Sequence, residues 1–220
     1  MHLRHGTEDA SIYDQVVNQN EYGLPDSFSV CDVIVDLGAN CGAFMWACAM
    51  RGAGQVWCVE PDLRNYATLL RNVGITAEHF RETQLFPIHA AMSDLPNVLL
   101  RMQPRNGQST ASARLTCQDE GEQVPSMSLP ELLHIIGRPV RLLKLDIEGA
   151  ELPVLNATKD LSMVQEVIGE IHYCISLDGR THPTDDWLRA TMDRLGFDCE
   201  IVPNKFIDPG VLGAWRGKRK

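Results

Sequence analysis

Short apolar runs alternate along this chain with segments whose apolar residues recur every three to four positions. The run Val33–Val35 predicts a strand, and the pattern over 42–51 predicts the helix that follows it. Further strands are expected at 55–59, 85–90, 140–145, 166–172 and 197–202, with additional candidates at 98–100 and 207–215. Further helices are expected at 63–72, 128–136, 151–157 and 185–195. Strands that alternate with helices predict an α/β fold, doubly wound around a mostly parallel sheet.

Local signals mark some of the element ends. Ser128 and Glu131 have the S-x-x-E spacing of a capping box, and Gly196 is a suitable residue to follow a helix C-terminus. Residues 103–108 read as a loop. Because no linker divides the chain, we expect one domain over 31–220, preceded by an N-terminal extension over 1–30 for which a helix is one option.

Composition and charge narrow the classes of partner. The net charge is −9, which disfavours nucleic acid as a partner, and the basic tail 216–220 reads as a solvated end. The sequence has neither a run long enough for a membrane helix nor a signal-peptide segment, so we expect a cytoplasmic protein without a membrane partner. The seven cysteines are odd in number and lack C-x-x-C spacing, which argues against a disulfide framework and a zinc site.

The first candidate site is the turn after the strand at 33–35. Asp36, Gly38, Asn40 and Gly42 place an acid and two glycines between a strand and a helix, and glycine allows a ligand to approach the backbone. Asn40 stands where a dinucleotide-binding turn has its second glycine. The Asp36 carboxylate suits an ammonium group, such as that of S-adenosylmethionine. The alternative is a turn that needs glycine for structural reasons alone.

A second acid lies where a ribose would be bound. Glu60 ends the next strand, about 20 residues after the glycine turn, where an acid can accept hydrogen bonds from both ribose hydroxyls. The alternative is an exposed residue at a strand end.

Acids and a histidine follow the two later strands. Asp146, Glu148 and Glu151 come directly after the strand at 140–145, and Glu170 and His172 end the strand at 166–172. A carboxylate or an imidazole at this edge of the sheet could take a proton or orient a hydroxyl. As alternatives, Glu148 and Glu151 would charge a helix N-terminus, and His172 would be structural.

Together these segments resemble the FkbM family of S-adenosylmethionine-dependent methyltransferases, over about 33–172. The segments that carry the resemblance are 35–42, 60–62 with Asn65, 90–94 and 143–151. The resemblance implies a class I methyltransferase (Rossmann-like) fold, with a seven-stranded, mostly parallel sheet and one reversed strand near the C-terminus. Cys41 is a departure, because the family often has a bulkier apolar residue there.

The resemblance also implies the reaction and the site. It implies O-methylation of a hydroxyl on a sugar or small natural product, with Asp146 and His172 as candidate bases and Glu148 as a third catalytic candidate. The residues expected to bind S-adenosylmethionine are Asp36, Gly38, Asn40, Gly42, Glu60, Pro61, Ala91, Ser93, Asp94 and Asp146. A Mg²⁺ ion held by Asp146 and a neighbouring acid is an alternative to a base. No residue is assigned as a metal ligand.

Two other functions stay open at this point. An NAD-dependent oxidoreductase on a similar sheet is disfavoured by Asn40 and by the lack of a Tyr-x-x-x-Lys pair. A non-catalytic module that binds the cofactor is disfavoured by the acids at the reacting edge. A nucleic-acid methyltransferase is further disfavoured by the lack of an Asn-Pro-Pro-Tyr segment. We expect a small-molecule acceptor and leave a homodimer open.

Overall fold

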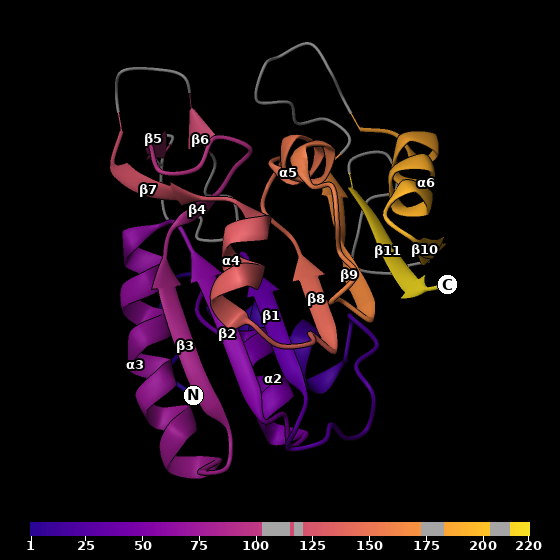
Figure 1. Ribbon diagram of the computed structural model, residues 1–220. Helices are drawn as coiled ribbons and strands as arrows, with labels where there is room; N and C mark the ends of the chain where they lie inside the picture. Colours follow the sequence, from indigo (N-terminus) through magenta and orange to yellow (C-terminus); the bar gives the residue numbers. More distant parts are fainter. Residues whose placement is uncertain (103–114, 117–120, 173–182, 203–211) are drawn as a thin grey trace.

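A seven-stranded sheet forms the centre of the molecule in this computed structural model, which describes residues 1–102, 115–116, 121–172, 183–202 and 212–220 (Figure 1). Its strands are β1 (Val33–Leu37), β2 (Gln55–Glu60), β3 (Gln84–His89), β8 (Leu142–Leu145), β9 (Glu166–His172), β10 (Phe197–Val202) and β11 (Leu212–Arg219). Their order is β10-β11-β9-β8-β1-β2-β3, and β11 is antiparallel to both of its neighbours whereas the other pairs are parallel. The predicted class I methyltransferase architecture is therefore confirmed.

Helices cover both faces of this sheet, as the continuous apolar strands predicted. The helices are α1 (Asp9–Tyr13), α2 (Ala43–Met50), α3 (Leu63–His79), α4 (Leu129–Ile136), α5 (Glu151–Ala157) and α6 (Asp185–Arg194), with a π-helical turn, η1, at Asp14–Asn18. A smaller sheet in the order β4-β7-β5-β6 consists of β4 (Ala91–Met92), β5 (Leu99–Met102), β6 (Leu115–Thr116) and β7 (Gln123–Met127). The loop expected at 103–108 lies outside the described residues.

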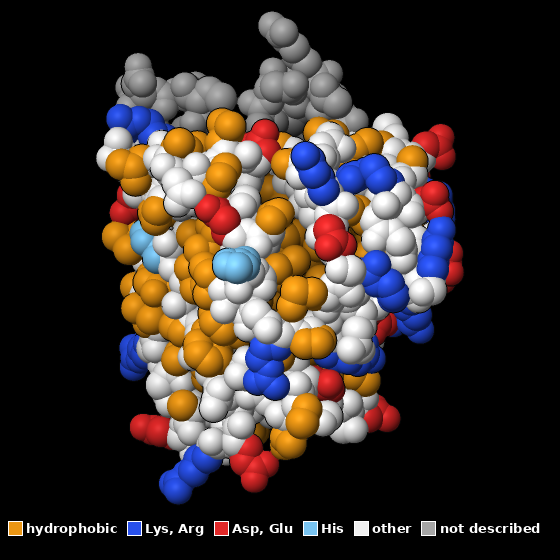
Figure 2. All heavy atoms as spheres, viewed as in Figure 1, with side chains coloured by type: hydrophobic (Ala, Val, Ile, Leu, Met, Phe, Trp, Pro, Cys, Tyr) orange, Lys and Arg blue, Asp and Glu red, His pale blue; other side chains and the backbone are white. Residues whose placement is uncertain are grey.

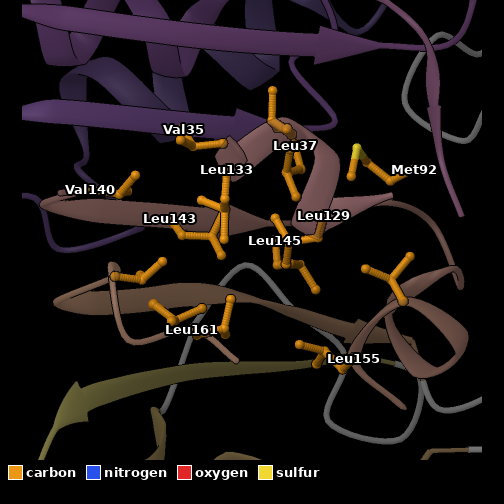
Figure 3. Packing of buried hydrophobic residues seen from close by; sticks show 14 of the residues in the cluster. Val35, Leu37, Met92, Leu129, Leu133, Val140, Leu143, Leu145, Leu155 and Leu161 are labelled. Carbon is orange, nitrogen blue, oxygen red and sulfur yellow. The ribbon is translucent and has the colours of Figure 1, made fainter. Parts of the chain in front are cut away.

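Alternate side chains of β1 enter two separate cores. Val35 and Leu37 pack with Leu143 and Leu145 of β8 and with α4, as Figure 3 shows for Leu129 and Leu133. Ile34 packs on the opposite face with α2 and with Val16 of the N-terminal segment. This segment therefore shares the core of the sheet, with Val16 only 4% exposed.

Capping chemistry explains where the helices begin. The expected capping box at Ser128 is present, because Ser128 Oγ accepts from the Glu131 N–H and Glu131 accepts from the Ser128 N–H. Asp62 caps α3 by accepting from the N–H groups of Arg64 and Asn65. Helix α3 runs seven residues beyond the expected end at 72, to His79.

The prediction of a solvated basic tail is wrong. Residues 216–219 belong to β11, between β9 and β10, and the Arg219 guanidinium donates to the carbonyls of Val164 (2.9 Å), Leu195 (3.1 Å) and Leu161. It also lies 4.2 Å from the ring centroid of Phe197. Bidentate donation to backbone carbonyls lets arginine occupy a sheet position that its charge alone would disfavour.

Three further features concern membrane helices, the apolar surface and the cysteines. No helix of the described residues is both long and apolar enough to cross a bilayer. Hydrophobic side chains gather on the face that carries β3 and α4 (Figure 2), where Trp57 stacks on Phe86 and Ile135 is 55% exposed. The cysteines within the described residues are free thiols, and Cys117 and Cys174 lie outside them.

Candidate functional site

The carboxyl ends of β1, β2, β8 and β9 meet at one edge of the sheet, because these strands are parallel neighbours (Figure 1). The glycine turn follows β1, Glu60 ends β2, Asp146 follows β8, and His172 ends β9. The residues predicted from the sequence to form the site are therefore brought to one edge. Open α/β sheets bind their ligands at this edge.

The glycine turn lies against the segment that carries Asp146. Gly38 has φ +82°, and a Cβ added to it would lie 1.8 Å from the Asp146 carbonyl oxygen. No larger residue fits this crossing. Asn40 also adopts the left-handed conformation, at φ 50°, which asparagine tolerates better than most residues. The turn expected to hold the cofactor and the acid expected to act in the reaction are thus in direct backbone contact.

Asp36 has a different partner from the one expected. It lies inside β1 rather than at its end and is fully buried, and its Oδ1 lies 3.1 Å from the Lys144 ammonium. Burial raises the pKa of Asp36, and Lys144 opposes that rise. In the structure the cationic partner of Asp36 is therefore a side chain of the protein, Lys144.

Glu60 is buried at the end of β2 and is already hydrogen-bonded. Its Oε2 accepts from the Asn40 N–H at 2.8 Å, and its Oε1 accepts from the Asp62 N–H at 3.0 Å and from Asn65 Nδ2 at 3.3 Å. Burial raises its pKa to about 7, although these donors lower it. A carboxylate has about four acceptor positions, so a ribose hydroxyl fits most readily at Oε2. The exposed strand-end alternative is wrong, because Glu60 is only 3% exposed.

The remaining residues expected to bind cofactor lie on two segments beside Glu60. The Pro61 carbonyl is 2.9 Å from His89 Nε2, at the end of β3. Ala91 lies in β4, and Ser93 donates its N–H to the Met127 carbonyl. Ala91 and Ser93 are buried, whereas Asp94 is exposed. Asn72 Nδ2 donates to the Cys41 carbonyl at 2.8 Å. Helix α3 therefore holds the glycine turn at Cys41, the residue that departs from the family pattern.

His172 contacts two acids of the turn after β8, one of which, Glu148, was expected to be catalytic. Its Nδ1 lies 3.0 Å from Glu151 Oε1, and its Nε2 lies 3.4 Å from Glu148 Oε2. Glu151 also accepts from the N–H groups of Ile147 and Gly149, so it holds the whole Asp146–Glu151 turn. Donor atoms of Asp146, Glu148 and His172 lie within 4.8 Å of one another, a spacing that suits mutual ion pairs and would also suit a shared divalent ion.

The charge of His172 changes the expected assignment of the base. Burial lowers its pKa, but the hydrogen bond and charge of Glu151, with the charges of Glu148 and Asp146, raise the pKa to about 9. This favours the imidazolium form at neutral pH, and an imidazolium cannot accept a proton. In that form His172 places a positive charge beside Asp146.

Asp146 is the ionised carboxylate of this cluster. Tyr22 donates its O–H to Asp146 Oδ2 at 2.9 Å, and the Lys144 ammonium lies 3.4 Å from the same oxygen. Burial raises the pKa of Asp146, but Lys144, His172 and Tyr22 together lower it below its usual value. Burial and the charge of Asp146 raise the pKa of Glu170 to about 8, which favours its protonated form.

Two residues of this network were missed in the sequence. Tyr22 lies in the N-terminal segment, more than a hundred residues from Asp146, and no local pattern connects them. Lys144 had a visible signal, because it is a charged residue inside the apolar strand β8, where it is only 3% exposed. A buried lysine requires a carboxylate partner, and Asp36 was available.

Comparison with known proteins agrees with this geometry. The chain matches the family model for the methyltransferase FkbM domain over residues 36–199. No curated protein matches it. Methyltransferase FkbM from Methylobacillus flagellatus KT has a similar structure, with a TM-score of 0.56 and 15% identity over 93% of this chain and 47% of the other. This chain thus spans about half the length of that protein.

Two structures that contain the cofactor or its product are also similar. Aeropyrum pernix fibrillarin, in complex with S-adenosyl-L-methionine, has a TM-score of 0.51 and 16% identity, over 91% of this chain and 74% of the other. M. capricolum TrmK, in complex with S-adenosyl-homocysteine, has a TM-score of 0.51 and 10% identity, over 92% of this chain and 67% of the other. At such identities the likeness establishes a common fold.

Proposed function

We propose that this chain, which belongs to the FkbM family of methyltransferases, transfers the methyl group of S-adenosylmethionine to a hydroxyl of a sugar or small natural product. The observation that carries the proposal is the position of Asp146. An ionised carboxylate directly contacts the glycine turn through its own backbone, at the edge where the family binds its cofactor. Family membership excludes the NAD-dependent oxidoreductase considered above.

The residues present fit the cofactor. Glu60 keeps acceptor capacity at Oε2 for a ribose hydroxyl, and the turn containing Gly38, Asn40 and Gly42 borders the same edge for the methionine end. The adenine is assigned to the segment after β3, where Ala91, Ser93 and Asp94 are its expected contacts. Pro61, directly after β2, is expected to contact the cofactor beside Glu60. When bound, S-adenosylmethionine supplies a methyl group already activated by its sulfonium. Asp36 is left out of this set because Lys144 neutralises it.

We assign Asp146 the role of binding the hydroxyl group of the methyl acceptor. Tyr22 and Lys144 both contact Oδ2, so we assign the hydroxyl of the acceptor to Oδ1. There it donates a hydrogen bond, which orients the acceptor oxygen and gives its proton a destination on Oδ1. Alignment of this kind contributes up to roughly 7–11 kcal/mol in ideal cases. The imidazolium of His172 and the carboxylate of Glu148 set the charge around Asp146.

The proposal is tested with a small-molecule extract of the source organism and isotope-labelled S-adenosylmethionine, with products identified by mass spectrometry. Asp146→Asn is expected to lower turnover by about 10²–10⁴ while S-adenosylhomocysteine still binds. The control is Asp186→Asn, an exposed acid on α6, which is expected to leave turnover unchanged. Wild-type turnover in both variants would contradict the role of Asp146.

Further measurements separate this proposal from its alternatives. We expect turnover to be unchanged by a chelator, and its loss and restoration by Mg²⁺ or another divalent ion would instead favour a metal at the acids. Cofactor binding without any labelled product would favour a non-catalytic module. We propose a cytoplasmic enzyme without nucleic-acid or membrane partners, and sedimentation tests whether it forms a homodimer.

A further inference from the structure

The N-terminal segment ends beside the reacting edge of the sheet. Residues 20–24 lie next to Asp146, although they precede the sheet by some ten positions. We infer that Tyr22 is a positioning residue for methyl transfer, whose O–H holds the Asp146 carboxylate in place, so that the N-terminal segment forms part of the reaction site. This inference rests on the proposed function of Asp146.

Three contacts fix the Tyr22 side chain. Its O–H donates to Asp146 Oδ2 at 2.9 Å, its ring meets Phe44 edge-on with centroids 5.4 Å apart, and the Lys144 ammonium lies 5.5 Å from the ring centroid. Phe44 belongs to α2, directly after the glycine turn. The ring is therefore held between the helix that follows the cofactor turn and Lys144 of β8, the strand that Asp146 follows.

The backbone of the same loop is held by a residue of β11. Arg216 of β11 donates to the carbonyls of Tyr22 and Gly23, both at 2.8 Å. Asn20 closes the loop by accepting from the Leu24 N–H at 2.8 Å and donating to the Leu24 carbonyl at 2.9 Å. Gly23 has φ +58°, and an added Cβ would lie 3.1 Å from the Arg216 guanidinium. These contacts restrict where the Tyr22 hydroxyl can lie.

The beginning of the segment is attached to the cofactor turn. The His2 N–H donates to Asn72 Oδ1 at 2.6 Å, and Asn72 Nδ2 donates to the carbonyls of His2 and Cys41 at 2.9 and 2.8 Å. One end of the segment is thus bonded through α3 to the turn, and the other end is bonded to Asp146. The segment connects the two halves of the site.

Tyr22 is an uncharged donor to Asp146 Oδ2, an oxygen that the Lys144 ammonium also contacts at a longer distance. The charged and titratable groups around Asp146 are Lys144, His172, Glu170, Glu21, Asp36 and Glu148. Lys144 is shared among Asp36, the Gly38 carbonyl and Asp146. Burial and nearby acids raise the pKa of Tyr22, so it stays protonated and donates throughout the working range of pH. The family match begins at residue 36, so this donor lies outside the matched region.

The test compares Tyr22→Phe with Tyr13→Phe, which makes the same change in α1 of the same segment. Turnover is measured as S-adenosylhomocysteine formed with the small-molecule extract, and S-adenosylhomocysteine binding is measured by calorimetry. We expect Tyr22→Phe to lower turnover about ten-fold or more, with the dissociation constant changed by less than about two-fold, because one charge-assisted hydrogen bond is lost away from the cofactor. Tyr13→Phe is expected to match the wild type.

A second readout needs no acceptor. With aspartate labelled with ¹³C at its carboxyl carbon, the Asp146 signal is identified by its loss in Asp146→Asn. In Tyr22→Phe this signal is expected to shift at neutral pH and to titrate about one pH unit or more higher, since the lost donor favoured the ionised form. Arg216→Gln, which keeps Tyr22 but removes its clamp, is expected to lie between wild type and Tyr22→Phe in turnover.

The outcomes separate the inference from the proposed function. An unchanged Asp146 signal and wild-type turnover in Tyr22→Phe would overturn the inference. If Tyr22→Phe fails to fold, wild-type turnover and an unchanged Asp146 signal in Arg216→Gln would overturn it. If the wild type forms no S-adenosylhomocysteine but the Asp146 signal responds to Tyr22→Phe, the proposed function fails and the positioning contact stands.

Discussion

Replacing Glu60 by glutamine is expected to weaken the binding of S-adenosylhomocysteine about ten-fold or more. Glutamine keeps the size of the side chain and one acceptor oxygen, but it loses the charge and places an NH₂ group opposite one of the two backbone N–H groups, which donate to different oxygens of Glu60. A hydrogen bond to a charged group contributes about 1.5–3 kcal/mol, and each 1.4 kcal/mol corresponds to a factor of ten. Glu60→Ala is less informative, because it would leave the N–H groups of Asn40 and Asp62 without their buried acceptor.

The affinity for S-adenosylhomocysteine should also depend on pH, in a direction that follows from the pKa of Glu60. Burial raises the pKa of Glu60 to about 7, and hydroxyl donors favour the ionised carboxylate, so binding should become tighter as the pH rises from about 6 to 8. Binding near neutral pH should also release a proton. For the unbound protein, the stability that Glu60 contributes is present below the unfolded-state value of 4.5 and is lost as the pH rises through about 7.

Calorimetry in buffers of different ionisation enthalpy measures both the affinity for S-adenosylhomocysteine and the proton release on binding. The control is Glu82→Gln, at an exposed position between α3 and β3, which should bind S-adenosylhomocysteine like the wild type. If Glu60→Gln binds as tightly as the wild type and with the same proton release, Glu60 does not contact the ribose and the reasoning from its buried carboxylate is refuted.

Two further predictions concern stability. Arg219→Met should lower the free energy of unfolding by about 2–4 kcal/mol in urea denaturation, because buried carbonyls lose charged donors, whereas Lys218→Met on the exposed side of β11 should have little effect. Equal effects would contradict the account of β11. His172 has its pKa raised from 6.5 to about 9, so it stabilises the fold below pH 6.5, and this contribution is lost as the pH rises through about 9. In His172→Gln the unfolding midpoint should therefore vary less with pH between these limits than it does in the wild type. An unchanged dependence on pH would show that His172 is not an imidazolium in the folded protein.

Most of the sheet could be predicted because its strands carry their signal locally. The strands at 166–172 and 197–202 and the helix at 151–157 have the predicted bounds. The strand at 166–172 is a buried apolar run, which is the kind of local signal that a sequence shows directly. β11 was predicted only in part, by the candidate strand at 207–215, which overlaps its first four residues. Its C-terminal half reads as a basic tail, and the carbonyls that pair with Arg219 come from residues 24 to 58 positions earlier.

The position of the site could also be predicted, but its network of contacts could not. Parallel topology alone brings Glu60, Asp146 and His172 to one edge. The protonation state of His172 depends on Glu151, which local reading assigned to the helix N-terminus. Tyr22 depends on a tertiary contact across 124 positions, for which a single sequence carries no periodic or motif signal.

The partner of Asp36 shows why register limits such predictions. In the observed register Asp36 lies opposite Lys144 on the adjacent strand, and both side chains point to the same face. A shift of one residue would send the two side chains to opposite faces and leave each charge buried alone. The apolar pattern of the two strands tolerates either register, because both faces of this sheet are covered. The buried pair therefore favours one register over the other. The Lys144 ammonium then also lies 3.0 Å from the Gly38 carbonyl and 3.4 Å from Asp146, so the pairing that selects the register also connects the cofactor turn to the reacting carboxylate.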